Sequence, residues 1–179
     1  MDAASELFLE RSYAHTSIEQ ITTRAGVSRA SFFNYFGAKS DLLWGDLDSL
    51  VDAVAGRLAE QPADVEPMEG VRQALIAAAG SVGADRIPLA ITQCDLIGAG
   101  DDLLTSGFRR FVRLAGHVEH YLDLARSGDF PARAAAFAVV GALAAAAGEW
   151  AASGTRRGPL APVIDAAVTP VCRGYGGSS

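Results

Sequence analysis

The chain has few cysteines, no excess of basic residues and no apolar run long enough to cross a bilayer. Its two cysteines, Cys94 and Cys172, lie far apart among apolar residues and form no CxxC pair. This argues against a disulfide scaffold or a zinc site and suits a reducing cytoplasm. The longest apolar run, 134–148, is shorter than the roughly 20 residues that a spanning helix needs. We therefore expect a buried helix there, a cytoplasmic protein and no signal peptide at the start.

The charge balance is acidic. The formal net charge is −6 and the isoelectric point is near 5.0, which disfavours general attraction to nucleic acid. Residues 1–48 hold four cations against seven acids. Net charge does not exclude DNA as a partner, because a local face can bind phosphates while acidic helices elsewhere keep a protein soluble. A DNA-binding face must therefore come from the arrangement of its residues.

The apolar residues recur at helical spacing along the chain, and no segment alternates as a strand would. Half of the residues are hydrophobic and 20% are charged, so a core can form. The pattern predicts an all-α fold, with a linker at 61–67. Helices are expected from the start to Ser12, over 18–25 and 28–36, from about Lys39 to Glu60, and over 69–82, 86–98, 102–127, 131–153 and 160–174, followed by a frayed tail.

Residues 18–36 have the spacing of a helix-turn-helix. Thr16 and Ser17, each with an acid or amide three residues on, form a capping pattern before the first short helix. Gly26 stands where a helix needs a left-handed residue to end, and Ser28 can cap the second helix. The polar residues of the second helix face away from its apolar side and can meet base edges and phosphates. They are Ser28, Arg29, Ser31 and Asn34.

A second interpretation of this segment is that it forms two core helices of a bundle, filled by its four aromatic residues. The aromatic residues belong mostly to the core in both interpretations. The DNA-binding interpretation therefore depends on the polar positions between them.

The chain resembles the TetR family of bacterial regulators through LFLERSYAHTSIEQI at 7–21, AGVSRASFFNYF at 25–36 and the Lys39 that follows. The match covers residues 4–43. It implies a three-helix DNA-binding helix-turn-helix domain over 1–45 and a helical ligand-binding and dimerisation domain over 46–179. The second domain agrees with the family only in the number and length of its helices.

The resemblance also implies roles for single residues. Ser28, Arg29, Ser31 and Asn34 would lie on the recognition helix, Tyr35 and Lys39 would hold phosphates, and Thr16 and Ser17 would anchor the second helix. A narrower similarity, through FFNYF, Lys39 and the WGD at 44–46, is to actinobacterial regulators of the mycofactocin type. That subgroup implies a long acyl-CoA thioester as the effector.

The sequence departs from the family pattern at three places. Family members carry a basic arm before the first helix, whereas Met1 already stands inside that helix, so we expect several N-terminal residues to be missing from this chain. Phe33 replaces a common tyrosine and loses a hydroxyl that can bind phosphate, and Ala38 replaces a common capping serine. Each lost phosphate contact should lower the affinity and reduce the log–log salt slope by about 0.9.

The helix expected over 102–126 carries two stripes at helical spacing. The first is apolar and comprises Leu104, Phe108, Phe111, Ala115, Val118 and Leu122. The second lies beside it, adds a cation, an imidazole and a phenol, and comprises Leu103, Gly107, Arg110, Leu114, His117, Tyr121 and Leu124. An apolar cavity with a few polar groups is what a small-molecule site requires.

We expect the effector to contact this helix at Phe108, Arg110, Phe111, Leu114, His117 and Tyr121. In the family that the chain resembles the effector lies against the fourth helix too, which implies Trp44, Leu47 and Val51 as the opposing wall. The alternative is a broad buried face from which Arg110 and His117 reach solvent or a carboxylate.

The sequence predicts no metal, cofactor or catalytic residue. His117, Glu119 and His120 lie close together but do not have the HxxEH spacing, and no third ligand is evident. No nucleophile elbow and no triad-like set is present, so an enzyme, for example a small helical hydrolase, is the weaker interpretation.

The helix expected over 132–153 carries a seam of small residues, Gly141, Ala145 and Gly148, which lets another helix approach closely. With the last helix it would form a four-helix bundle across a two-fold axis, and the alternative is packing inside one subunit only. The sequence therefore predicts a homodimeric, ligand-responsive regulator, a repressor released from its DNA operator by a small apolar, acyl-CoA-like effector. The rival interpretation is a helical ligand-binding dimer of the same fold that no longer binds DNA.

Overall fold

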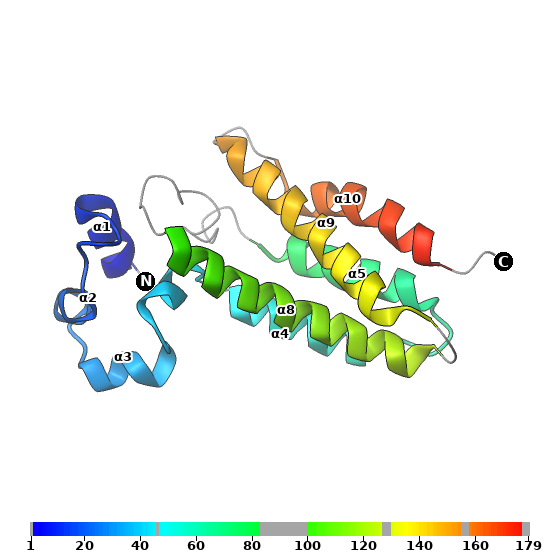
Figure 1. Cartoon of the computed structure of the whole chain (residues 1–179), viewed down its shortest axis with the longest axis horizontal. Coiled ribbons are helices and arrows are strands. Elements are labelled where there is room, and N and C mark those ends of the chain that lie inside the picture. The colour runs from blue at the N-terminus through cyan, green and yellow to red at the C-terminus, as the bar shows by residue number, and fades with distance from the viewer. Residues whose placement is uncertain (1, 46, 83–99, 127–129, 155–157, 177–179) are drawn as a thin grey trace. The chain divides into compact units, whose positions relative to one another are not determined.

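The structure is a computed structural model that describes residues 2–45, 47–82, 100–126, 130–154 and 158–176. Within these ranges every regular element is helical, which confirms the all-α prediction (Figure 1). The elements are α1 (Asp2–Arg11), α2 (Ile18–Ala25), α3 (Arg29–Tyr35), the 3-10 helix η1 (Lys39–Leu43), α4 (Leu47–Ala59), α5 (Pro67–Gly80), α8 (Gly100–Ala125), α9 (Ala132–Ala152) and α10 (Leu160–Tyr175).

The prediction of one continuous helix from Lys39 to Glu60 is wrong. The structure has the short η1 followed by α4, and Gly45 between them has a φ of +54°. A left-handed residue cannot continue a right-handed helix, so the chain turns there. The helix expected over 86–98 and the end of the tail, 177–179, lie outside the described residues.

The chain divides into two compact units, Met1–Leu47 with Arg86–Phe108, and Asp48–Asp85 with Arg109–Ser179. Two helices belong to both units, because the division falls inside α4 and inside α8. Each unit has its own hydrophobic core.

The first unit is built around the buried faces of α1, α2, α3 and η1. Phe8 and Tyr13 pack ring against ring with centroids 5.2 Å apart. The core residues recur at helical spacing and exclude water from the space between the short helices. They are Ala4, Leu7, Phe8, Tyr13, Ile21, Phe32, Leu42 and Leu43.

The second unit is a bundle in which α10 packs against both α9 and α5. The buried side chains include Val51 and Leu58 from α4, Leu75 from α5 and Val118 from α8. An ion pair also joins two of its helices, because the Arg72 guanidinium on α5 lies 2.5 Å from a carboxylate oxygen of Asp165 on α10.

The first stripe of α8 is buried only in its C-terminal half. Ala115, Val118 and Leu122 are fully buried, whereas Leu104 and Phe108 are 72% and 66% exposed. The second stripe supplies much of the inner face, since Arg110 and Leu114 are both buried.

Helix α9 extends beyond the apolar run at both ends and agrees with the helix expected over 131–153. It has 21 residues, and its most apolar 18-residue window has a mean hydropathy of 1.5 with 39% of the window buried. Among the described helices it alone meets the length and composition of a bilayer span, a test that the core helix of a soluble protein also passes.

Candidate DNA interface and effector site

The first helix of the helix-turn-helix is fixed at both ends by local hydrogen bonds. The Ser17 hydroxyl oxygen accepts from the Gln20 N–H at 3.2 Å, and the Ser17 N–H donates to the Gln20 side-chain oxygen at 2.8 Å. At the other end Gly26 has a φ of +68°. The predicted capping pattern is confirmed for Ser17 with Gln20 but not for Thr16 with Glu19, and the left-handed terminator at Gly26 is confirmed.

The second helix, α3, begins at the predicted cap. The Ser28 hydroxyl oxygen accepts from the Ser31 N–H at 3.0 Å and lies 2.9 Å from the Ser31 hydroxyl. Phe32 faces the core, while Arg29 and Asn34 are exposed. The helix therefore turns an apolar side inward and a set of short polar side chains outward, as a recognition helix requires.

The end of α3 exposes one further predicted residue. Tyr35 is 83% exposed, so its hydroxyl is open to a partner. Phe33 is also exposed and carries the Arg29 guanidinium 5.7 Å from its ring centroid. The aromatic residues of this segment are therefore only partly core, in contrast to the expectation that they mostly fill it.

Thr16 is a structural anchor. Its side chain is 2% exposed, and its hydroxyl donates to the carbonyl oxygens of Leu7 at 3.2 Å and of Ser12 at 2.8 Å. The hydroxyl thereby holds the segment before α2 against α1. A buried hydroxyl with both bonds made inside the protein offers no surface to DNA, so we retain Thr16 only as an anchor.

Lys39 is also bonded inside the first unit. Its ammonium donates to the carbonyl oxygens of Tyr13 at 2.8 Å and Thr16 at 2.9 Å and lies 3.9 Å from the centre of the Tyr13 ring. Burial lowers the pKa of Lys39, and the charge of Asp102 opposes that shift. An ammonium has three donors, and these two carbonyl oxygens use two of them.

A second cation of the helix-turn-helix is paired with carboxylates. Arg24 on α2 donates to Glu10 at 2.8 Å and lies 3.4 Å from Glu6, both on α1. The hydrogen bond from Arg24 lowers the pKa of Glu10. This pair fixes α2 to α1 and reduces the positive charge that the unit can offer to DNA.

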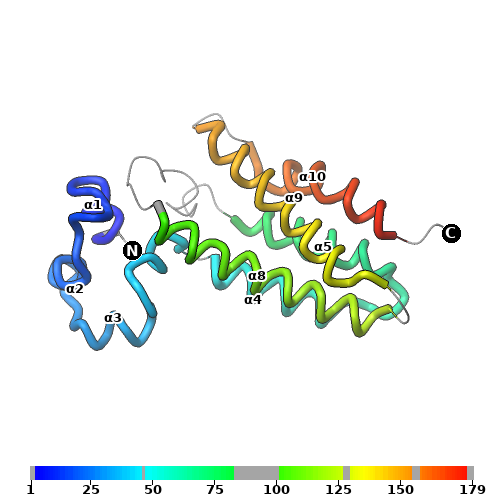
Figure 2. Tube along the Cα trace, in the orientation of Figure 1, coloured from blue at the N-terminus to red at the C-terminus, as the bar shows by residue number. Residues whose placement is uncertain are grey.

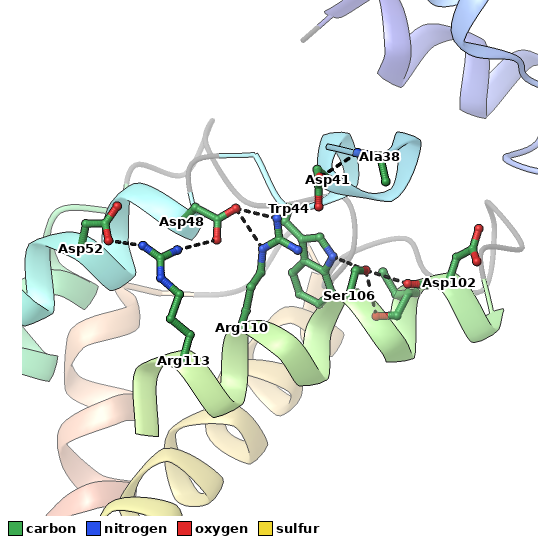
Figure 3. Close-up of polar contacts among 10 residues, drawn as sticks. Ala38, Asp41, Trp44, Asp48, Asp52, Asp102, Ser106, Arg110 and Arg113 are labelled. Atoms are coloured by element: carbon green, nitrogen blue, oxygen red, sulfur yellow. Dashed lines mark hydrogen bonds and ion pairs between the residues drawn. The ribbon is translucent and has the colours of Figure 1, made fainter. Parts of the chain in front are cut away.

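Trp44 contacts the first two turns of α8, in the first unit, through the edge of its indole that carries the N–H (Figure 3). Its indole N–H donates to the Ser106 hydroxyl oxygen at 2.8 Å, and that hydroxyl donates to the Asp102 carbonyl oxygen at 2.7 Å. A methyl group on Gly107 would come within 2.8 Å of two ring carbons of Trp44. Only glycine allows the ring to lie this close.

The first turn of α8 also contacts Tyr13, which follows α1 in the first unit. The Tyr13 hydroxyl donates to a carboxylate oxygen of Asp102 at 3.0 Å. Burial, and next the hydrogen bond to Asp102, raise the pKa of Tyr13. Sequence analysis did not single out Asp102 or Ser106, because each meets its partner only through the fold.

Arg110, predicted to contact the effector, forms an ion pair in the second unit (Figure 3). Its side chain is 8% exposed, and it donates to one carboxylate oxygen of Asp48 at 2.5 Å and 3.1 Å. The other oxygen of Asp48 accepts from Arg113 at 3.1 Å, and Arg113 also pairs with Asp52. Arg110 thus pairs with a carboxylate, as the alternative to an effector contact predicted.

His117 and Tyr121 are the other polar residues of the predicted effector set. The His117 Nε2 atom is buried and has no hydrogen-bond partner among the described residues. Tyr121 is half-buried, and a methyl group on Gly70 would come within 2.5 Å of its hydroxyl oxygen. Burial raises the pKa of Tyr121, helped by the charge of Glu66. A buried imidazole nitrogen without a partner is costly unless a ligand or water satisfies it.

The remaining residues of the predicted effector set differ in burial, because Phe108 is exposed and Leu47 is half-buried, whereas Leu114, Val51 and Phe111 belong to or pack against the core. Leu114 and Val51 are buried in the second unit, and the Phe111 ring lies 5.6 Å from that of Phe137. An open groove of about 630 Å³ lies beside this core, where α8 meets the start of α9. None of the predicted effector residues lines it; its walls are Glu119, Asp123, Phe130, Pro131, Ala132, Arg133, Ala134 and Phe137.

Comparison with known proteins identifies the N-terminal segment. Residues 1–43 match the family model described as bacterial regulatory proteins, tetR family. The HTH-type transcriptional regulator TcmR of Streptomyces glaucescens is 32% identical over 79 residues, which is 44% of this chain and 35% of that protein. MftR of Mycobacterium tuberculosis, named as a candidate mycofactocin biosynthesis transcriptional regulator, is 29% identical over 76 residues, 42% of this chain and 38% of that protein. The matched segment thus spans little more than a third of these relatives.

Solved structures show the same fold along most of the chain. Thermus thermophilus FadR, a TetR family transcriptional repressor in complex with lauroyl-CoA, superimposes with a TM-score of 0.62 at 21% identity, over 99% of this chain and 94% of that one. A regulator of the same family from Mesorhizobium loti gives 0.57 at 23% identity, over 98% and 94%.

The capped turn between α2 and α3, within a described architecture of helices, defines a helix-turn-helix. Residues 1–43 thus match the segment that defines the tetR family of bacterial regulatory proteins, and the chain has the fold of solved regulators of that family.

Proposed function

We propose that the protein is a ligand-responsive DNA-binding transcriptional regulator, a repressor that a small apolar effector releases from its operator. The observation that carries the proposal is α3, whose polar side chains face outward from a turn fixed by the caps at Ser17, Gly26 and Ser28. We further propose that residues 1–45 bind DNA and residues 46–179 bind the effector, that the protein works in the cytoplasm, and that it is not an enzyme, since its relatives are transcriptional regulators.

The DNA contacts would come from the exposed part of the helix-turn-helix. Arg29, Ser31 and Asn34 suit base edges and phosphates, because Arg and Asn can form paired hydrogen bonds with bases. Tyr35 and the remaining N–H of Lys39 would hold phosphates. Ser17 and Ser28, at the N-termini of α2 and α3, place backbone N–H groups where phosphates bind well.

The effector would bind in the second unit, against the inner face of α8. His117 offers a buried imidazole nitrogen without a partner, and Tyr121 offers a half-buried phenol. Such polar groups among apolar side chains suit a ligand with an apolar body and one polar end. An acyl-CoA fits that description, and the structural neighbour FadR is complexed with lauroyl-CoA.

The protein would act as a homodimer through α9 and α10. The small-residue seam of α9 is open in the single chain, since Gly148 and Ala145 are exposed and a methyl group on Gly141 or Gly148 would meet no atom within 4 Å. A second copy could lie close along this seam. A dimer would place two recognition helices in successive major grooves, roughly 34–36 Å apart.

The test is a fluorescence-anisotropy titration with a duplex recovered from random-sequence DNA by repeated selection on the protein, at low and moderate salt. We expect tight, salt-sensitive binding that an unrelated duplex does not match. Asn34→Ala should cost about 1–3 kcal/mol and relax the sequence preference, with an unchanged circular dichroism spectrum. Ser49→Ala, an exposed change in the second unit, is the matched control. Unchanged binding by both Asn34→Ala and Arg29→Ala would refute α3 as the recognition helix.

The second candidate is a ligand-binding dimer that does not bind DNA. It is supported by the charge of the first unit, where Arg24 pairs with two glutamates and Lys39 bonds to carbonyl oxygens. Failure of selection to enrich any duplex, together with binding of lauroyl-CoA measured by calorimetry, would favour this candidate.

A further inference from the structure

Two helices, α4 and α8, belong to both units. Close to the division between the units, side chains connect α8 to Trp44 in the first unit and to Asp48 in the second. The division falls between residues 47 and 48 in α4 and between residues 108 and 109 in α8. Figure 2 traces α8 as one helix. Inside the first unit Trp44 is bound to Ser106 and lies on Gly107. Inside the second unit Asp48 is bound to Arg110 and Arg113.

The contact between Trp44 and Gly107 is tightly packed. The Trp44 indole N–H is committed to Ser106, and its ring occupies the place where any side chain at position 107 would begin. A well-packed contact of this kind transmits a displacement instead of absorbing it. A shift of α8 along or about its axis must therefore move Trp44, which stands directly after η1.

We infer that Trp44, seated on Gly107, is the contact through which the state of the effector-binding unit is coupled to the affinity for DNA. The inference rests on the proposed function. An effector that changes how α8 lies against α4 in the second unit would displace Ser106 and Gly107 along the same helix. Trp44 would carry that displacement to the residues that hold α2 and α3.

Coupling between two binding equilibria is reciprocal, which gives a test that needs no effector. If the second unit influences DNA binding through this contact, DNA must influence the second unit through it. Bound DNA should then slow hydrogen exchange of the amides in the second-unit part of α8, Arg109–Ala125. A contact that only stabilises the first unit would not have this effect.

The structure offers a matched pair of substitutions. Gly107→Ala adds a methyl group that collides with the Trp44 ring, whereas Gly116→Ala adds the same group to the same helix where no atom lies within 4 Å. Both changes raise helix propensity equally. Trp44→Leu breaks the contact by removal of the ring instead, and keeps the test valid if Gly107→Ala does not fold.

The experiment measures amide exchange of α8 by mass spectrometry with and without a saturating selected duplex, with occupancy checked by anisotropy. We expect exchange in Arg109–Ala125 to slow by at least about fivefold in the unchanged protein and in Gly116→Ala, within the usual range of coupling factors. In Gly107→Ala or Trp44→Leu, still saturated with DNA, we expect exchange in Arg109–Ala125 to slow by less than about twofold.

Each other outcome is decisive. Equal slowing in all four proteins overturns the inference and leaves the proposed function intact. No slowing in the unchanged protein at full DNA occupancy also overturns it. If the unchanged protein binds no selected duplex, the proposed DNA-binding function fails first, and the inference fails with it.

Discussion

Gly70 on α5 lies so close to Tyr121 on α8 that even one methyl group cannot be added without movement. A carbon placed on Gly70 would be 2.5 Å from the Tyr121 hydroxyl oxygen and 3.3 Å from Cγ of Gln61. Gly70 is buried and Tyr121 is half-buried in the second unit, so the phenol cannot simply swing into solvent. Gly70→Ala should therefore strain the unit.

The magnitude follows from two opposing effects. Replacing a helical glycine by alanine gains about 1 kcal/mol of helix stability. Forcing an extra carbon into a packed site costs about 1–3 kcal/mol. Gly70→Ala should thus destabilise the protein by about 0–2 kcal/mol. Gly56→Ala on α4, where a methyl group meets no atom within 4 Å, should stabilise it by about 1 kcal/mol, because only the gain applies.

Urea unfolding at one fixed protein concentration measures both changes, since the stability of a dimer depends on concentration. The Tyr121→Phe background isolates the collision, because it removes the hydroxyl oxygen and keeps the ring. There Gly70→Ala should lose most of its cost, because only the closer packing against Gln61 remains. If Gly70→Ala stabilises the protein with Tyr121 intact as much as Gly56→Ala does, the packing described here is wrong.

Three further changes test the turn and the core. Gly26→Ala should lower the free energy of unfolding by about 1–2 kcal/mol, measured by urea, because its φ of +68° disfavours a side chain although a methyl group would touch nothing; Gly26→Asn should lose less. Ser17→Ala should cost about 1 kcal/mol in the same assay, and Ser17→Asp should retain most of the stability, because either oxygen can cap α2. Burial raises the pKa of Cys172 from 9.0 to about 11, so the thiol ionises earlier in the unfolded chain than in the folded one. Stability should therefore be full below pH 9 and fall between about pH 9 and pH 11, and in Cys172→Ala the urea midpoint should fall less over that interval.

The caps and turns of the helix-turn-helix could be predicted from sequence because their causes are local. Ser17 and Gln20 are three residues apart, Ser28 and Ser31 are three residues apart, and Gly26 needs no partner. Short-range hydrogen bonds and backbone preferences depend only on residues that are adjacent in the sequence. The same reasoning located α5, α9 and α10, whose starts and ends carry proline, glycine or polar residues.

The break between η1 and α4 could not be predicted in the same way. Leu43 and Leu47 continue the helical spacing across it, and a lone glycine at position 45 is tolerated in many helices. The chain turns there in a structure where Trp44 is bound to Ser106, 62 residues further on. A partner at that distance leaves no signal in the local pattern.

The candidate effector residues show a similar limit. Helical spacing correctly grouped Arg110, His117 and Tyr121 on one side of α8 but could not show which of them is paired inside the protein. Arg110 meets Asp48, whereas His117 keeps an unpartnered buried nitrogen. The pairing depends on how α4 lies against α8, and the spacing along one helix contains no information about the other.

The internal pairing of cations has a consequence for how this protein would recognise DNA. Of the four cations in residues 1–48, Arg24 is held by two glutamates and Lys39 by two carbonyl oxygens, whereas Arg11 and Arg29 are exposed. Together with the remaining N–H of Lys39, these make three cations per subunit, which can contribute only about −2.7 to the log–log salt slope. Phosphate attraction is then weak, and most of the affinity must come from neutral donors and base contacts on α3. Binding should therefore depend strongly on sequence, and its sensitivity to salt should be smaller than that of a protein that holds DNA mainly by charge.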